Sequence, residues 1–133
     1  MHELVMRIKK AELCYVFARN AVERGHEELA VEAYRRAVDL RAEEHEVQSE
    51  AELMALKSFY AYEEALSFQQ KKRKRATGTW QLVNRHGILG ALSKRLDSKY
   101  ASEAMPALKM LKMEDYAFKA VADNYPEALQ QAA

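Results

Sequence analysis

The sequence predicts an all-α protein, a compact helical bundle of about five to seven helices with a long central helix. The chain of 133 residues has only four Gly and two Pro, too few for a fold rich in turns. Its apolar residues recur every three or four positions over most of its length, as they do on one face of a helix. We therefore expect a single helical domain over residues 1–133, with an antiparallel three-helix part at 1–75 and a short-helix part at 76–133.

Residues 3–24 predict the first helix, because their apolar side chains recur at helical spacing and share one face. That face is formed by Leu4, Ile8, Ala11, Tyr15, Ala18 and Val22. Gly25 predicts a C-terminal cap, and acidic residues after His26 suit the positive end of a second helix. The apolar face of the second helix is formed by Ala30, Ala33, Tyr34, Ala37 and Leu40.

A third helix is expected to begin near Ser49 and to run to about Lys74. Ser49 and Glu52 have the spacing of a capping box, in which the two residues bond to each other's backbone. Two apolar stripes on this helix indicate that it is contacted from more than one side, as a central helix is. The first is Ala51, Met54, Ser58, Ala61, Ala65 and Phe68, and the second is Leu53, Leu56 and Tyr60.

The remaining chain predicts several short helices. Residues 76–79 indicate a turn with Thr77 or Thr79 as the next cap, and a helix from Trp80 is expected to stop at His86–Gly87. Another helix is expected over 88–96, followed by a linker over 97–102 and a helix with Pro106 in its first turn. A further helix is expected from Glu114–Asp115, with a stop and restart at Asn124 and Pro126.

The stretch from Ala11 to Leu40 resembles a tetratricopeptide repeat, most clearly in its second half. That family places Gly at the turn, then a small Ala, an aromatic residue four positions later and Ala three after that. Gly25, Ala30, Tyr34 and Ala37 stand in those places, whereas Cys14, Phe17–Ala18 and Ala42 stand where the family has Trp, Leu-Gly and Pro. The resemblance covers about 30 of the 133 residues and implies a helical hairpin that binds protein or peptide.

Charge is segregated along the chain. The net charge is +1, but residues 1–70 carry −5, residues 71–99 carry +8 and residues 100–133 carry −2. Such asymmetry is informative about partners rather than about the fold. Five consecutive cations, Lys71 to Arg75, open the basic segment, and on a helix they would repel one another unless an anion relieved them.

We therefore predict a non-enzymatic binding protein that engages a polyanion, above all nucleic acid, through the basic segment 71–99. Hydroxyl, amide, guanidinium and indole groups follow the cations, and such groups contact phosphates and stack on bases. The expected nucleic-acid contacts are Lys71, Lys72, Arg73, Lys74, Arg75, Trp80, Asn84, Arg85, Lys94 and Arg95.

Other interpretations of this segment stay open. The cations can be a solvated helix end that complements the helix dipole, or can attract an acidic protein face such as the first half of this chain. Trp80 can anchor the core beside the turn instead of stacking on a base.

A second function is a protein-interaction adaptor, or a small regulator or inhibitor of a larger complex, that uses the helical-hairpin surface. Phe59, Tyr60 and Tyr62 cluster on the third helix, and adjacent positions cannot all face one core. We expect at least one of them in a protein interface, with a partner or in a homodimer, because Tyr is favoured there.

The chain shows no arrangement for catalysis, metal binding or cofactor binding. Its four His and single Cys are scattered, and its glycines form no phosphate loop. Glu63 and Glu64 are adjacent, so their side chains diverge on a helix and we interpret them as charges on a solvated face. We expect no enzyme activity, no metal and no small-molecule cofactor.

We expect a cytoplasmic protein with no membrane partner. No stretch approaches the roughly 20 apolar residues of a membrane span, and the first residues lack the layout of a secretory signal. The single Cys14 cannot form an internal disulfide and fits a reducing compartment.

Overall fold

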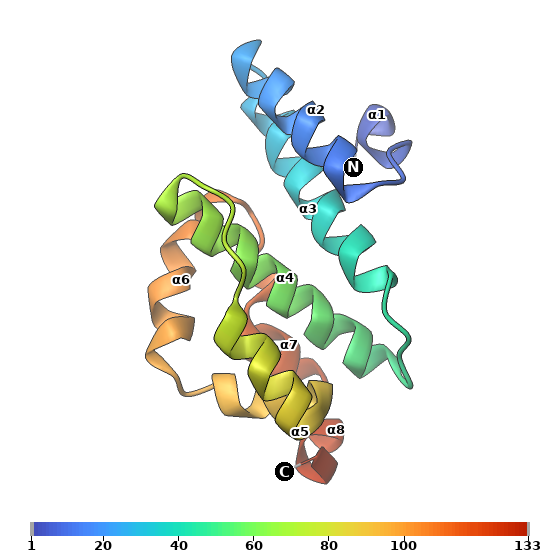
Figure 1. Cartoon of the computed structure of the whole chain (residues 1–133), viewed down its shortest axis with the longest axis vertical. Coiled ribbons are helices and arrows are strands. Elements are labelled where there is room, and N and C mark those ends of the chain that lie inside the picture. Colours follow the sequence, from blue (N-terminus) through green and yellow to red (C-terminus); the bar gives the residue numbers. More distant parts are fainter. Residues whose placement is uncertain (1, 133) are drawn as a thin grey trace. The chain divides into compact units, whose positions relative to one another are not determined.

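The computed structural model describes residues 2–132 (Figure 1). Every regular element in that range is a helix, eight of them α-helices and one a 3₁₀ helix, so the all-α prediction is confirmed. The chain divides into two compact units, Met1–His45 and Glu46–Ala133. The boundary expected at residues 75 and 76 therefore falls inside the second unit. Within the described range, no helix is long and apolar enough to cross a membrane.

The first unit is a helical hairpin preceded by one short helix. Its helices are α1 (Glu3–Met6), α2 (Ala11–Glu23) and α3 (Glu27–Glu43). Gly25 adopts a positive φ of 78° after α2, and the amide of His26 donates to the carbonyl of Ala21 at 2.7 Å, which closes α2 as a Schellman cap. Alanines, including Ala18 and Ala33, form most of the buried contact, so α2 and α3 approach closely.

The continuous helix expected over residues 3–24 is wrong, because the chain leaves the helical conformation between α1 and α2. Arg36 Nε donates to the carbonyl oxygen of Ile8 at 3.2 Å, so a long-range bond takes a group that a continuous helix would use internally. The break also rotates the buried face. Val5 is fully buried, whereas Leu4 and Val22 are about half exposed.

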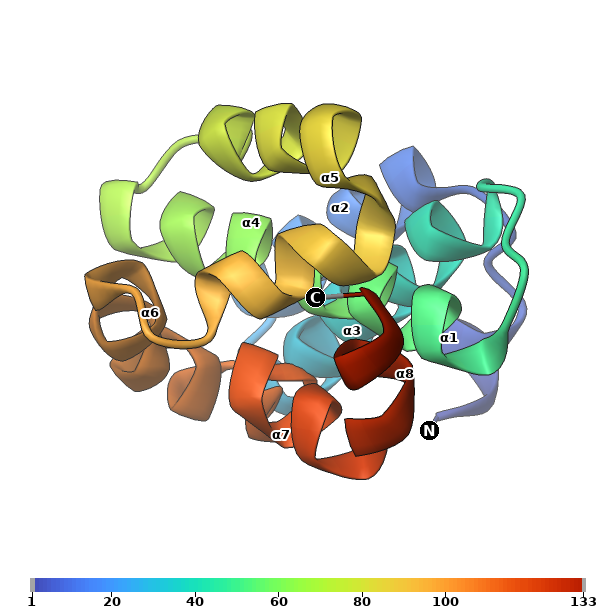
Figure 2. The ribbon, with the colours of Figure 1, turned by 90° about the horizontal axis from the view of Figure 1, so that it is seen from below.

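The second unit is built around α4, as the two apolar stripes predict. Helices α5, α6 and α7 and the 3₁₀ helix η1 contact α4, and Figure 2 shows the three helices arranged around it. Its elements are α4 (Glu50–Gln70), α5 (Thr77–Arg95), α6 (Lys99–Met110), η1 (Glu114–Tyr116), α7 (Phe118–Asn124) and α8 (Pro126–Ala132).

The start of α4 is as predicted and its end is not. Ser49 Oγ accepts from the amide of Glu52 at 3.2 Å, which confirms the cap, and the Glu52 carboxylate accepts from the amide of Gln48 at 2.7 Å. The helix ends at Gln70 rather than near Lys74, because Lys71 adopts a left-handed conformation with φ 58°. Phe68, expected in the buried seam, is exposed.

Helix α5 has the expected interruption at Gly87. This residue has φ 77° and ψ 175°, so two helical segments meet there at an angle. The expected threonine cap is wrong, since Ala76 is the N-cap and no side chain caps the helix. Thr79 is fully buried and its Oγ1 accepts from Arg95 Nε at 3.0 Å. The hydroxyl is therefore used for a tertiary contact.

The region after α5 differs from prediction at its proline. The linker expected over 97–102 is shorter, because α6 begins at Lys99, and Pro106 lies in the interior of that helix. Pro106 cannot donate to the carbonyl of Ser102, but both residues are exposed and water can reach that carbonyl. Asn124 ends α7, and Pro126 begins α8 in the first-turn position that suits proline.

Candidate functional site

The five consecutive cations form a loop and not a helix end. Lys71 ends α4 in the left-handed conformation, and residues 73–76 have no regular secondary structure before α5 begins. We call residues 71–75 the basic loop. The expectation of five cations around a helix is therefore wrong, and the loop's conformation comes from tertiary contacts made by the last two turns of α4.

Glu64 forms the first of these contacts. Its carboxylate accepts two hydrogen bonds from the guanidinium of Arg73, at 2.9 and 2.7 Å. Glu64 is only 3% exposed, whereas the Arg73 side chain is 47% exposed. The placement of Glu63 and Glu64 on a solvated face is wrong, because both carboxylates are buried. A bidentate pair of this kind fixes both distance and orientation.

Glu63 forms the second contact, at the far end of the loop. Its Oε2 accepts from the amide of Ala76 at 2.9 Å and from Trp80 Nε1 at 2.6 Å. The Trp80 ring also packs against Tyr60, with ring centroids 5.0 Å apart, and edge-on against Phe59 at 5.8 Å. The contacts support the interpretation of Trp80 as an anchor of the turn.

Ser67 holds the middle of the loop. Its Oγ donates to the carbonyl of Glu63 at 2.8 Å and accepts from the amide of Lys74 at 3.0 Å. The carbonyl of Ser67 accepts from the amide of Lys72 at 3.3 Å. Together with the two glutamates, Ser67 ties residues 72, 73 and 74 of the loop, and Ala76 just after it, to α4.

The other four cations of the basic loop have no carboxylate partner in the part of the chain that the structure describes. Lys71, Lys72 and Arg75 are exposed and Lys74 is half-buried. None of the four forms an ion pair or a side-chain hydrogen bond within residues 2–132. The loop therefore presents positive charge at fixed backbone positions.

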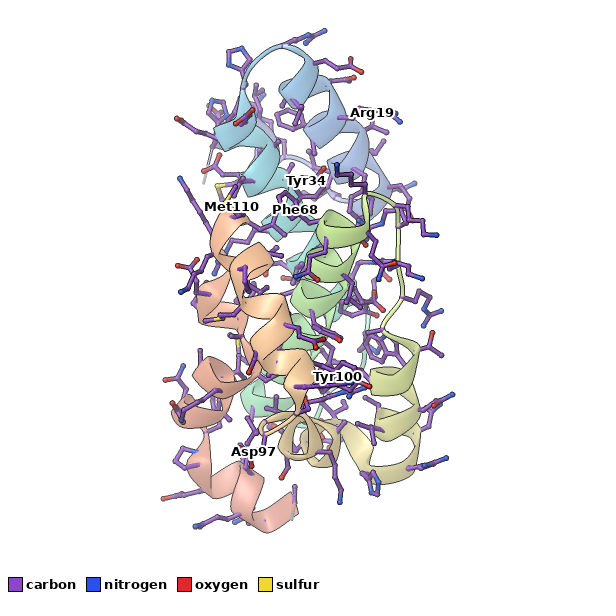
Figure 3. The ribbon with its side chains drawn as sticks, turned by 90° about the vertical axis from the view of Figure 1, so that its left-hand side faces the viewer. Arg19, Tyr34, Phe68, Asp97, Tyr100 and Met110 are labelled. Carbon is purple, nitrogen blue, oxygen red and sulfur yellow. The ribbon has the colours of Figure 1, made fainter. Side chains whose placement is uncertain are left out.

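Arg95 lies beside the start of α5, immediately after the basic loop. Besides its bond to Thr79, its guanidinium lies 4.9 Å from the centre of the Tyr100 ring, and Lys99 lies 5.6 Å from the same ring. Figure 3 shows Tyr100 projecting from α6 toward α5. A Cβ built on Gly78 would lie only 3.0 Å from Arg95 Nη2, so Gly78 permits this close approach.

Asn84, Arg85 and Lys94 lie apart from this group. Asn84 and Arg85 are exposed and come seven and eight residues after Thr77, about 10–12 Å further along the helix axis. Lys94 is exposed and lines a separate hollow with residues that include His86 and Asp97. The contacts of Arg95 with Thr79 and of Arg95 and Lys99 with Tyr100 therefore bring these two cations to the start of α5, which directly follows the basic loop.

The aromatic cluster of α4 is largely internal to the second unit. Phe59 is fully buried and Tyr62 is 7% exposed, and their rings lie 6.2 and 5.2 Å from that of Phe118. Tyr60 is half-buried against Trp80, so it has the most exposed surface of the three. Their predicted place in a protein interface stays a prediction.

Glu63, Glu64 and Ser67 are the site residues that sequence reasoning missed. A usable signal was present, since two acidic residues sit in a mostly apolar stretch, one to three turns before a run of cations. Within the described part of the chain, no group of three or more His, Cys, Asp or Glu side chains could hold a metal ion.

The chain matches no protein-family model, and neither a curated protein nor a solved structure matches it.

Proposed function

We propose that the second unit is a non-enzymatic module that binds the phosphate backbone of nucleic acid through the basic loop. The observation that carries this proposal is that one cation of the loop is paired within the unit whereas the other four are not. Arg73 is paired with a buried glutamate, while Lys71, Lys72, Lys74 and Arg75 have no carboxylate partner within the described range. Arg73 therefore holds the loop against α4, and the other four side chains are available to bind an anion.

The fixed backbone favours binding. Four cations within five residues repel one another, and neutralising phosphates would remove that repulsion and release counterions from the nucleic acid. A loop already held at positions 72, 73, 74 and 76 loses little further conformational entropy when it binds.

We propose different roles for the other residues that the sequence predicts as nucleic-acid contacts. Arg73, Trp80 and Arg95 each donate a hydrogen bond to another residue of the second unit, so we assign them to positioning the loop and the start of α5. Asn84, Arg85 and Lys94 lie further along α5 and would be outer contacts of a longer ligand. No base-reading surface is part of the proposal, because phosphate contacts carry no sequence information.

The test compares two variants that lose the same charge. In the loop variant, Lys71, Lys72, Lys74 and Arg75 are changed to Gln, and in the control variant Lys9, Lys10, Arg19 and Arg24 of the first unit are changed to Gln. All four control residues are exposed. Binding to a fluorescent duplex of about 20 base pairs is measured by anisotropy at about 50 mM salt.

We expect the loop variant to bind about tenfold or more weakly than the control variant. Equal loss in both variants would show only a response to net charge, and unchanged binding in the loop variant would remove the loop from the mechanism. Either result would overturn the proposal.

The second candidate is a protein-interaction adaptor, or a regulator of a larger complex, and one observation favours it. Leu13 and Val16 lie three positions apart on α2 and are 54% and 42% exposed. This apolar stripe belongs to the hairpin that resembles a tetratricopeptide repeat. Binding through it, to another protein or to a second copy, would survive high salt and be lost on changing Leu13 and Val16 to Gln. Under either proposal we expect a cytoplasmic location.

A further inference from the structure

A cavity of about 210 Å³ lies within the second unit, away from the basic loop. It is bounded by α4, α6 and the segment from η1 into α7. Aromatic and aliphatic side chains, among them Tyr62, Leu108 and Phe118, form most of its wall. Helix α6 contributes the small residues Ala101 and Ala104 to the same wall.

One polar group in this wall lacks a partner. Ser58 is 1% exposed, it lines the cavity, and its Oγ has no hydrogen-bond partner within the described residues. A serine inside a helix commonly bonds to the carbonyl four residues earlier, but Ser58 does not. Buried hydroxyls are almost always paired, so an unpaired one beside a cavity needs an explanation.

Among the described residues that line the cavity, Lys119 is the one that carries a charge. Lys119 is exposed and pairs with Asp123 at 3.2 Å, whereas the inner wall contains the hydroxyls of Ser58 and Tyr62. Burial raises the pKa of Tyr62 above its usual value, so its phenol stays neutral well past neutral pH. A charged ligand would lose its hydration against the buried apolar wall, and the lining cation Lys119 is already paired with Asp123, so the cavity favours a neutral ligand.

We propose that this cavity binds a small, neutral, largely apolar molecule of up to two rings, whose single polar group forms a hydrogen bond with Ser58 Oγ. The volume sets the size, because a dry cavity of about 150 Å³ holds benzene and this one is larger. An apolar body with one or two placed polar groups is the usual chemistry of such pockets. The inference does not depend on nucleic-acid binding.

The test uses 2-naphthol and naphthalene, two probes of similar shape that differ by one hydroxyl group. Each is titrated into the full chain, and binding is followed through backbone amide shifts in two-dimensional NMR spectra. The variants are Ser58→Ala, which removes the unpaired hydroxyl, and Ser102→Ala, a matched control because Ser102 lines the same cavity but is exposed. Ala101→Leu narrows the cavity.

We expect 2-naphthol to bind about fivefold to tenfold more tightly than naphthalene, with shifts at residues of the cavity wall. Ser58→Ala should abolish this preference, Ser102→Ala should keep it, and Ala101→Leu should weaken both probes. Failure of both probes to bind, or a preference that survives Ser58→Ala, would overturn the proposal. Ser58→Ala removes an unsatisfied group, so we expect it to fold, and an unchanged amide spectrum without probe verifies this.

Discussion

The Arg73 guanidinium grips the Glu64 carboxylate through two hydrogen bonds of 2.9 and 2.7 Å, and Glu64 lies nine positions earlier, on the last turns of α4. The pair explains why a run of five cations ends a helix and does not prolong it. Arg73 neutralises the buried Glu64 carboxylate, and this contact holds the loop against α4. The neighbouring cations are held in place with it, although their side chains have no carboxylate partner among the described residues.

Removing Arg73 alone should lower the free energy of unfolding more than removing both Arg73 and Glu64. Arg73→Met leaves the Glu64 carboxylate buried without its cation, and we expect a loss of about 2 kcal/mol, less than for a fully buried pair because Arg73 is half exposed. Arg73→Met combined with Glu64→Leu should lose less. Urea unfolding measures both free energies, and a double variant less stable than the single one would contradict the account.

Trp80→Phe should destabilise the second unit by about 1–3 kcal/mol. Phenylalanine keeps much of the ring contact with Phe59 and Tyr60 but removes the hydrogen bond of 2.6 Å to the buried Glu63. The measurement is chemical unfolding, with Trp80→Phe combined with Glu63→Gln as a control. A change of less than about 0.5 kcal/mol in Trp80→Phe would mean that this bond does not hold the turn.

Gly87→Ala distinguishes a kinked α5 from a straight one, because the substitution changes the stability in opposite directions in the two cases. In a continuous helix the substitution would stabilise the protein by roughly 0.5–1 kcal/mol. At φ 77° and ψ 175° alanine is strained, so we expect a loss of about 1–3 kcal/mol. Thermal unfolding at several scan rates is sufficient to decide, and a gain in stability would show that the kink is absent.

Tyr62 predicts a loss of stability at alkaline pH. The pKa of Tyr62 is raised above its ordinary value of 10.0, and burial is the largest cause. Tyr100 and Glu103 also raise this pKa, whereas Arg95 lowers it. The folded protein therefore keeps a proton that the unfolded chain releases, and the free energy of unfolding falls as the pH rises through about 10. Tyr62→Phe should reduce this fall between about pH 9 and 11. Parallel curves for both proteins would refute the assignment.

Local features of the fold were predictable because neighbouring residues determine them. Ser49 and Glu52 cap α4 within one turn, and Gly25 and Gly87 take backbone conformations that other residues avoid. Pro126 begins α8 for a similarly local reason.

Other features were predicted wrongly because they depend on partners distant in sequence. Arg36 takes the carbonyl of Ile8, 28 positions away, and so breaks the first helix. The carboxylates of Glu63 and Glu64 are buried because Trp80 and Arg73 come back to them. Helical periodicity cannot show a contact between a helix and the loop that follows it. It therefore did not reveal the residues that anchor the basic loop, whereas the run of exposed cations is visible in the sequence.

The sequence also did not predict the exposure of two apolar residues at one end of the second unit. Phe68 and Met110 are 47% and 66% exposed, and Figure 3 shows both at the same end, at the C-terminal ends of α4 and α6. Periodicity placed Phe68 in the buried seam, but α4 ends two residues later and the side chain is exposed.

The salt dependence of nucleic-acid binding tests the central claim most directly, because it counts neutralised phosphates. The logarithm of the association constant with duplex DNA is plotted against that of the salt concentration for the native protein and for the variant with Lys71, Lys72, Lys74 and Arg75 changed to Gln. Each neutralised phosphate contributes about −0.9 to the slope, so the two slopes should differ by about 3.6 if all four cations engage. Equal slopes would contradict the account.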